Sequence, residues 1–200
     1  MALEIPNPPE ESRKTLVEGL RRLAPRAKGT FMSESLGGAP PEIANAHQVF
    51  ILSPQAIADS RDLSAAKAVG WGYVVNQPAT NLSSGSSVVA AEVLERGGGH
   101  AFSNMQQGWI GRATQRTIAV AKTLPQVIAG SYELRMLRIP ALYTDTLWLK
   151  DRVAANDLIV PIASASNQVR ADQPYTVINF LSLMRDLIGQ KKGFDNSPKV

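Results

Sequence analysis

The chain has 200 residues, of which 44% are hydrophobic and 19% are charged, and its formal net charge is +4. This composition excludes a disordered chain, and the length suffices for one domain with a hydrophobic core. The absence of cysteine excludes disulfides, thiolate catalysis, cysteine-based zinc sites and iron–sulfur clusters.

The first predicted element is a helix close to the start of the chain. Asn7 can cap it, Pro8 suits its first position, and two glutamates follow at the positive end of the helix dipole. Pro25 ends the apolar stripe of this helix, which consists of Leu16, Val17, Leu20 and Leu23.

Two short strands are predicted next, after a loop over residues 25–45. His47–Leu52 is a continuous apolar run of the kind found in strands buried on both faces. Trp71–Val75 is rich in β-branched and aromatic residues, which favours a second strand. The segment Asp59–Ala68 between them can hold a short helix.

Two further helices are predicted after the polar segment 76–87. Its serines can cap a helix over Val88–Arg96, which Gly97 would end in a left-handed conformation. A second helix is predicted from about Gln107 to Leu124, because apolar residues recur on one face and Pro125 follows.

An antiparallel meander is predicted over residues 131–162. Tyr132, Leu134 and Met136 alternate with charged residues, which is the period of a strand. A second strand is expected over 141–149 and a third over 157–162, separated by a polar turn. Because large side chains on these strands can be buried across the turn, we predict that the meander is core sheet.

A long helix is predicted at the end of the chain. Asp172 can cap it, Pro174 fits its first turn, and Gly189 is its expected stop. We expect residues 191–200 to be a frayed tail after a single domain over residues 1–190. The predicted fold class is α+β, with a mostly antiparallel sheet, helices packed on one face and a helix near each terminus.

His100 and Asp145 are the weak catalytic candidates. His100 follows three glycines, so it is either a mobile general base, with Ser103 or Asn104 nearby, or an ordinary loop histidine. Asp145 is a candidate acid or base if its side chain points inward, and an ordinary solvated residue if it points outward.

The better-known catalytic motifs are missing from the sequence. The glycine loop matches neither phosphate-binding pattern, GxxxxGK[ST] or GxGxxG. Ser64 and Lys67 spell S-x-x-K, but the SDN and KTG elements of penicillin-recognising enzymes do not accompany them. With two histidines and no HExxH spacing, we predict no metal site and no cofactor.

Arg112 and Arg116 are the candidate anion-binding residues. They lie four positions apart on one predicted helix face, in a segment from Arg96 to Tyr132 that contains no Asp or Glu. Like charges at this spacing repel each other weakly. An anion, an acidic partner or a carboxylate from elsewhere in the fold can offset that repulsion, and the sequence leaves these alternatives open.

Three functions are therefore compatible with the sequence. The first is a non-catalytic binding or assembly protein acting through an oligomeric or partner interface, which the low charged fraction favours. The second is an enzyme of unrecognised type with a site around the loop Gly97–Asn104. The third is an anion or nucleic-acid binder acting through Arg112 and Arg116.

A cytoplasmic location is expected from two features of the sequence. The chain has no run of about 18 apolar residues that would span a membrane. Its opening residues, MALEIPNPPEESRK, place Pro and Glu where a signal peptide needs an apolar run.

Overall fold

The computed structural model describes residues 3–23, 42–77, 87–154 and 156–195. Within these residues the chain forms five α-helices and nine mostly antiparallel strands, so the predicted α+β class is confirmed. The helices are α1 (Glu10–Leu23), α3 (Pro54–Asp59), α4 (Trp109–Thr123), α5 (Pro125–Ala129) and α6 (Val177–Asp195). The strands are β1 (Leu3–Glu4), β2 (Glu42–Ile51), β3 (Lys67–Gln77), β4 (Ser87–Arg96), β5 (Gly99–Gln107), β6 (Tyr132–Ile139), β7 (Thr144–Asp151), β8 (Leu158–Ala163) and β9 (Tyr175–Thr176).

The chain divides into two compact units, each built from separate stretches of sequence. We call the first the α6 unit; it consists of Met1–Glu4, Phe50–Ala68 and Thr117–Val200. The second, the α1 unit, consists of Ile5–Val49 and Val69–Arg116. The expectation of a single domain over residues 1–190 stays a prediction.

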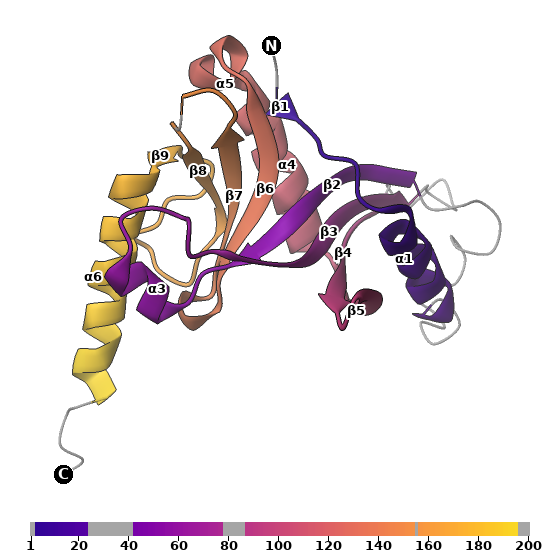
Figure 1. Ribbon diagram of the computed structural model, residues 1–200, viewed down its shortest axis with the longest axis horizontal. Helices are drawn as coiled ribbons and strands as arrows, with labels where there is room; N and C mark the ends of the chain where they lie inside the picture. Colours follow the sequence, from indigo (N-terminus) through magenta and orange to yellow (C-terminus); the bar gives the residue numbers. More distant parts are fainter. Residues whose placement is uncertain (1–2, 24–41, 78–86, 155, 196–200) are drawn as a thin grey trace. The chain divides into compact units, whose positions relative to one another are not determined.

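The α6 unit contains the predicted meander. Strands β6, β7, β8 and β9 are consecutive antiparallel neighbours, and β1 pairs with β6 in parallel. One face of these strands packs against α6 (Figure 1) through a core that includes Leu137, Trp148, Ile159, Phe180 and Met184. The opposite face is buried as well, and α5 lies on that side. The meander is therefore core sheet, as the sequence predicts.

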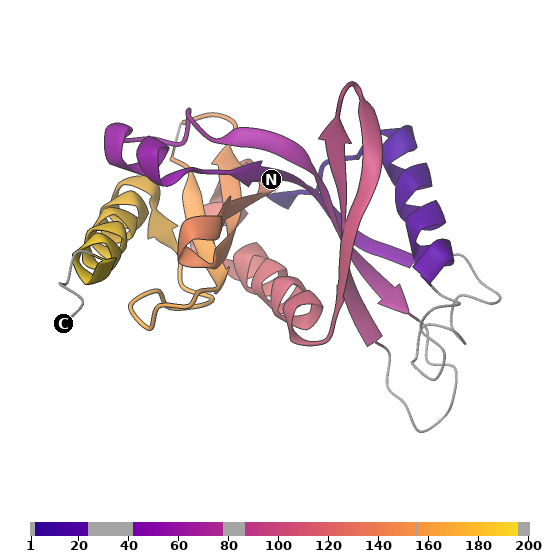
Figure 2. The same cartoon turned by 90° about the horizontal axis from the view of Figure 1, so that it is seen from below.

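The α1 unit is an antiparallel arrangement in which α1 lies along β4 and β5 (Figure 2). Its strand order is β5-β4-β3-β2. The core joins Leu16 and Leu20 of the helix to alternate residues of the strands, namely Trp71, Tyr73, Val75, Val89, Ala91 and Val93. A buried hydrogen bond of 2.6 Å between the hydroxyls of Ser12 and Tyr73 fixes the helix on the sheet.

The predicted helix over Val88–Arg96 is wrong, because this segment is strand β4. Gly97 does adopt a left-handed conformation, with φ of 58°, but Gly98 does too, with φ of 79°. Two consecutive positive φ values are the geometry of a tight hairpin turn. The glycines therefore join β4 to β5 and do not cap a helix.

Two other boundaries differ from the predictions. Helix α3 precedes the expected segment 59–68, because Ser53 caps it by accepting the Ala56 backbone N–H at 3.2 Å. Helix α6 begins after Thr176, whose hydroxyl accepts the Asn179 backbone N–H at 3.3 Å, and it continues past Gly189. A glycine without a left-handed conformation does not end a helix.

Candidate functional site

The loop Gly97–Asn104, proposed from the sequence as an enzyme site, is a hairpin turn followed by strand β5. His100 pairs across the hairpin with Glu95, and its side chain is only 13% exposed. Its Nδ1 lies 3.7 Å from a carboxylate oxygen of Glu11. Ser103 and Asn104 are exposed at a bulge on the same strand. The histidine is therefore enclosed between strand and helix, and its catalytic role stays a prediction.

Asp145 lies on β7 opposite Arg138 of β6. Its Oδ1 accepts a hydrogen bond of 2.8 Å from the Arg138 Nε. Both side chains are about one quarter exposed. This geometry is that of a cross-strand ion pair, and it gives Asp145 a structural role in holding the register of β6 and β7.

Arg112 and Arg116 are both exposed on α4, as an anion-binding role requires. Arg116 nevertheless interacts with another part of the chain. The anion-binding role of the two arginines stays a prediction.

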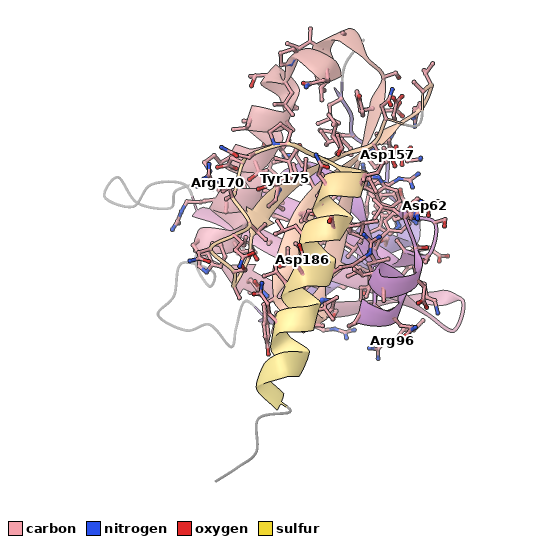
Figure 3. The ribbon with its side chains drawn as sticks, turned by 90° about the vertical axis from the view of Figure 1, so that its left-hand side faces the viewer. Asp62, Arg96, Asp157, Arg170, Tyr175 and Asp186 are labelled. Atoms are coloured by element: carbon pink, nitrogen blue, oxygen red, sulfur yellow. The ribbon has the colours of Figure 1, made fainter. Side chains whose placement is uncertain are left out.

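A pocket of the described residues lies in the α6 unit, beside the start of α6. Its volume is about 590 Å³, within the range of ligand-binding clefts. Figure 3 shows two of its residues, Asp62 and Asp157, on the same side of α6. The pocket is lined by Phe50, Arg61, Asp62, Leu63, Ser64, Ala66, Arg135, Trp148, Lys150, Asp157, Val177 and Ile178. We call it the Arg135 pocket.

The floor of the pocket is a guanidinium group held over two aromatic rings. The rings of Phe50 and Trp148 meet edge to face, with centroids 5.0 Å apart. The guanidinium carbon of Arg135 lies 5.1 Å from the first centroid and 5.0 Å from the second. Both distances are within the range of a cation–π contact. The register of the sheet explains the arrangement, because Arg135 and Trp148 are direct cross-strand partners.

A chain of alternating charges fixes the orientation of Arg135. Its Nε donates to Glu133 at 2.8 Å, and the second oxygen of Glu133 accepts from Arg152 at 2.7 Å. Arg152 also binds Glu4 of β1 at 2.6 Å. Burial by itself raises the pKa of Glu133, but the hydrogen bonds from Arg152 and Arg135 outweigh it, so the pKa is lowered.

These contacts leave the far end of the guanidinium available to a ligand. Within the described residues, no hydrogen bond or ion pair of Arg135 other than that of its Nε to Glu133 occurs. Arg135 lines the pocket, and within the described residues its two Nη atoms, with four N–H groups, make no hydrogen bond.

Asp157 organises the other side of the pocket. Its carboxylate accepts the Trp148 indole N–H at 2.7 Å and the Asp151 backbone N–H at 3.0 Å. Lys150 contributes a third donor, with its Nζ 3.2 Å from both oxygens. A carboxylate engaged by three groups is a poor general base, so Asp157 holds the indole and the lysine in place.

The hydroxyl of Ser64 does not have the setting of a nucleophile. It donates at 2.6 Å to Asp62, which also accepts the Ser64 backbone N–H at 2.9 Å. The side-chain hydrogen bond from Ser64 lowers the pKa of Asp62, and its backbone hydrogen bond lowers it further. An ionised acceptor can orient the hydroxyl, but no histidine lines the pocket to carry a proton away. Lys67, the lysine of the S-x-x-K sequence, is not among the described residues that line the pocket.

The described residues contain no group of three or more His, Asp or Glu side chains placed to hold a metal ion. None of the described helices is long and apolar enough to cross a membrane. Comparison of the chain with protein-family models, curated protein sequences and solved structures gives no match. The geometry of the pocket is therefore the basis for the functional argument.

The sequence analysis missed the pocket, although one signal of it was present. Glu133 and Arg135 alternate with buried residues on β6, and Trp148 and Lys150 are two positions apart on β7. Period two places all four side chains on one face of the meander. Three of these positions carry charges, and the cross-strand register places one of them, Arg135, opposite Trp148. This pattern was open to detection once the strands were paired.

Proposed function

We propose that the protein is a non-catalytic binding protein whose ligand carries an anionic group bound by Arg135. The observation that carries this proposal is the open end of a guanidinium fixed at its Nε and stacked over Phe50 and Trp148. The two Nη atoms match the spacing of two acceptor oxygens on one anion.

The setting of Arg135 favours binding because little freedom is lost when a ligand arrives. Glu133 and the two rings already hold the side chain in one orientation. A side chain that is ordered before binding does not lose rotamer entropy on complex formation. Each hydrogen bond to a charged group contributes about 1.5–3 kcal/mol when it replaces contacts with water. Two such bonds contribute about 3–6 kcal/mol to the binding of a small anion.

The surroundings of the pocket support binding more than catalysis. Asp157 is occupied by three donor groups and Ser64 by Asp62. Neither provides the nucleophile and base pair that covalent catalysis needs. Assembly into a homo-oligomer, or docking of a protein partner, remains part of the proposal as a further role of the exposed surface.

The proposal is tested by nuclear magnetic resonance of the indole N–H groups during titration with small anions. The Trp148 indole lines the pocket and donates to Asp157, whereas Trp109 is exposed and is not a lining residue. We expect acetate to move the Trp148 signal with a saturable dependence and to leave the Trp109 signal unchanged. Assignment uses the W148F and W109F variants.

Two variants locate the anion site. R135Q removes the positive charge and the paired Nη donors of the guanidinium group. Glu133 keeps its hydrogen bond to Arg152 in this variant, so we expect the fold to be retained. We expect R135Q to abolish the shift of Trp148. The double variant R112Q/R116Q is the matched control, since it removes two exposed arginines that do not line the pocket. Binding lost in the control and kept in R135Q would overturn the proposal and favour the α4 arginines.

A further inference from the structure

We propose that the ligand of the Arg135 pocket is a monocarboxylate with an apolar body. Its carboxylate binds end-on to the two Nη atoms of Arg135, and its body packs against Leu63, Val177 and Ile178. This inference rests on the proposed function and specifies the chemical class of the ligand.

The charges around the pocket select a single negative charge. Asp62 and Asp157 line the same pocket as Arg135. The hydrogen bonds from Ser64 keep Asp62 ionised at neutral pH. Lys150 is engaged by Asp157 and is not a free second cation. Because Asp157 and Lys150 offset each other, Asp62 is the aspartate that repels a dianion, such as a phosphate monoester, more strongly than a monoanion.

The shape of the available donor also favours a carboxylate. The open Nη pair of Arg135 is a planar fork, and a carboxylate accepts it with two parallel hydrogen bonds. A tetrahedral phosphate has further oxygens that need donors of their own. Within the described part of the pocket, Arg61 is the other arginine, and it lies on the exposed loop after α3.

The apolar wall of the pocket accounts for the second half of the ligand. Ile178 is 72% exposed at the start of α6, although it lines the pocket together with the buried Leu63. Val177 and Ala66 extend the apolar lining. Water covers this surface in the free protein, so a hydrocarbon chain that displaces it gains affinity. Burial of one methylene group corresponds to about fourfold tighter binding.

The test is a titration series with acetate, butyrate and hexanoate, followed through the Trp148 indole signal. We expect the dissociation constant to fall about fourfold per methylene group until the wall is covered. Hexyl phosphate and hexanamide are the comparison ligands, because they keep the chain and change the head group. We expect both to bind at least tenfold more weakly than hexanoate.

Two isoleucine variants test whether the apolar wall of the pocket, and not another apolar part of the surface, contributes to hexanoate binding. I178S removes the apolar side chain at the pocket rim, and I128S removes one of similar exposure, 59%, on α5. We expect I178S to weaken hexanoate binding about three- to tenfold and to leave acetate binding unchanged. I128S should change neither dissociation constant.

The outcomes distinguish this inference from the proposed function. Equal binding of hexyl phosphate and hexanoate, or no gain from acetate to hexanoate, would overturn the monocarboxylate assignment and leave an anion-binding site at Arg135. Failure of every anion, including sulfate, to shift the Trp148 signal would overturn both.

Discussion

Two glycines inside helices should respond in opposite directions to the same substitution. Gly19 of α1 lies against Phe102 of β5, and an added Cβ there would come within 2.8 Å of the Phe102 Cβ and nearer still to its ring. Gly189 of α6 has open space around it, with nothing within 4 Å of an added Cβ. Neither glycine has a positive φ.

The magnitudes follow from helix propensity and overpacking. Replacing glycine by alanine in a helix interior stabilises it by about 0.5–1 kcal/mol. G189A should therefore raise the free energy of unfolding by that amount. At Gly19 the same gain is offset by overpacking, which costs about 1–3 kcal/mol. The nearest of these atoms belong to the Phe102 ring, which a rotamer change can move, but the Phe102 Cβ stays within 2.8 Å of the added Cβ, so a rotamer change alone does not relieve the whole clash. We expect G19A to lower the free energy of unfolding by about 1–2 kcal/mol.

Urea denaturation followed by circular dichroism measures both changes, and a thermal scan should show shifts of about 2–4 °C per kcal/mol. The double-mutant cycle with F102A isolates the contribution of the ring to the clash, because G19A should be less destabilising when the ring is absent and only the Cβ of residue 102 remains. A G19A protein that is as much stabilised as G189A while the Phe102 ring is present would refute the packing argument.

Four further tests concern buried or paired polar groups. S12A should lower the free energy of unfolding by about 1–3 kcal/mol, because the buried Tyr73 hydroxyl loses its partner. Burial raises the pKa of Tyr73 above 10.0, so the folded state retains the proton and stability falls as the pH rises past 10.0; Y73F should remove that decline. The pKa of Glu133 is lowered, so the pH dependence is reversed: the folded protein loses stability as the pH falls below 4.5. In urea denaturation at several pH values, E133Q should reduce this loss of stability at acidic pH. R185M removes bonds of 2.9 and 2.6 Å to carbonyls at the end of α3, so amide hydrogen exchange there should become faster than in the rest of the α6 unit.

Periodic segments of the sequence were sufficient to predict most elements of the fold. The stripe of α1, the meander over β6–β8 and the helix over Trp109–Thr123 all appear where apolar spacing places them. The helix prediction for Val88–Arg96 was wrong because the Ala, Glu and Leu residues of this segment favour helices. In the structure its buried residues Val89, Ala91 and Val93 alternate with period two, as they do in a strand. Pairing with β3 and β5 decided the outcome, which is a tertiary effect.

The candidate site was less accessible to sequence reasoning than the fold. The pocket collects side chains from the end of β2, the loop after α3, the meander and the start of α6. No fixed spacing relates these positions, because the topology alone brings them together. His100 and Asp145 stood out through their residue type and neighbours, and both proved to be enclosed or ion-paired. Arg135 was overlooked because an arginine on a strand with a glutamate two residues away is common on sheet surfaces.

The interleaved segments of the two units have a consequence for synthesis on the ribosome. The α1 unit is complete once residue 116 has emerged, whereas the α6 unit still lacks the whole meander and α6 at that point. The α6 unit also includes the early segments Met1–Glu4 and Phe50–Ala68, whose partners in the fold are translated much later. For example, β1 pairs with β6. Contacts this distant in sequence form slowly. The nascent chain therefore passes through a stage in which Phe50 is exposed without Trp148, and early chaperone contact would fall on that segment.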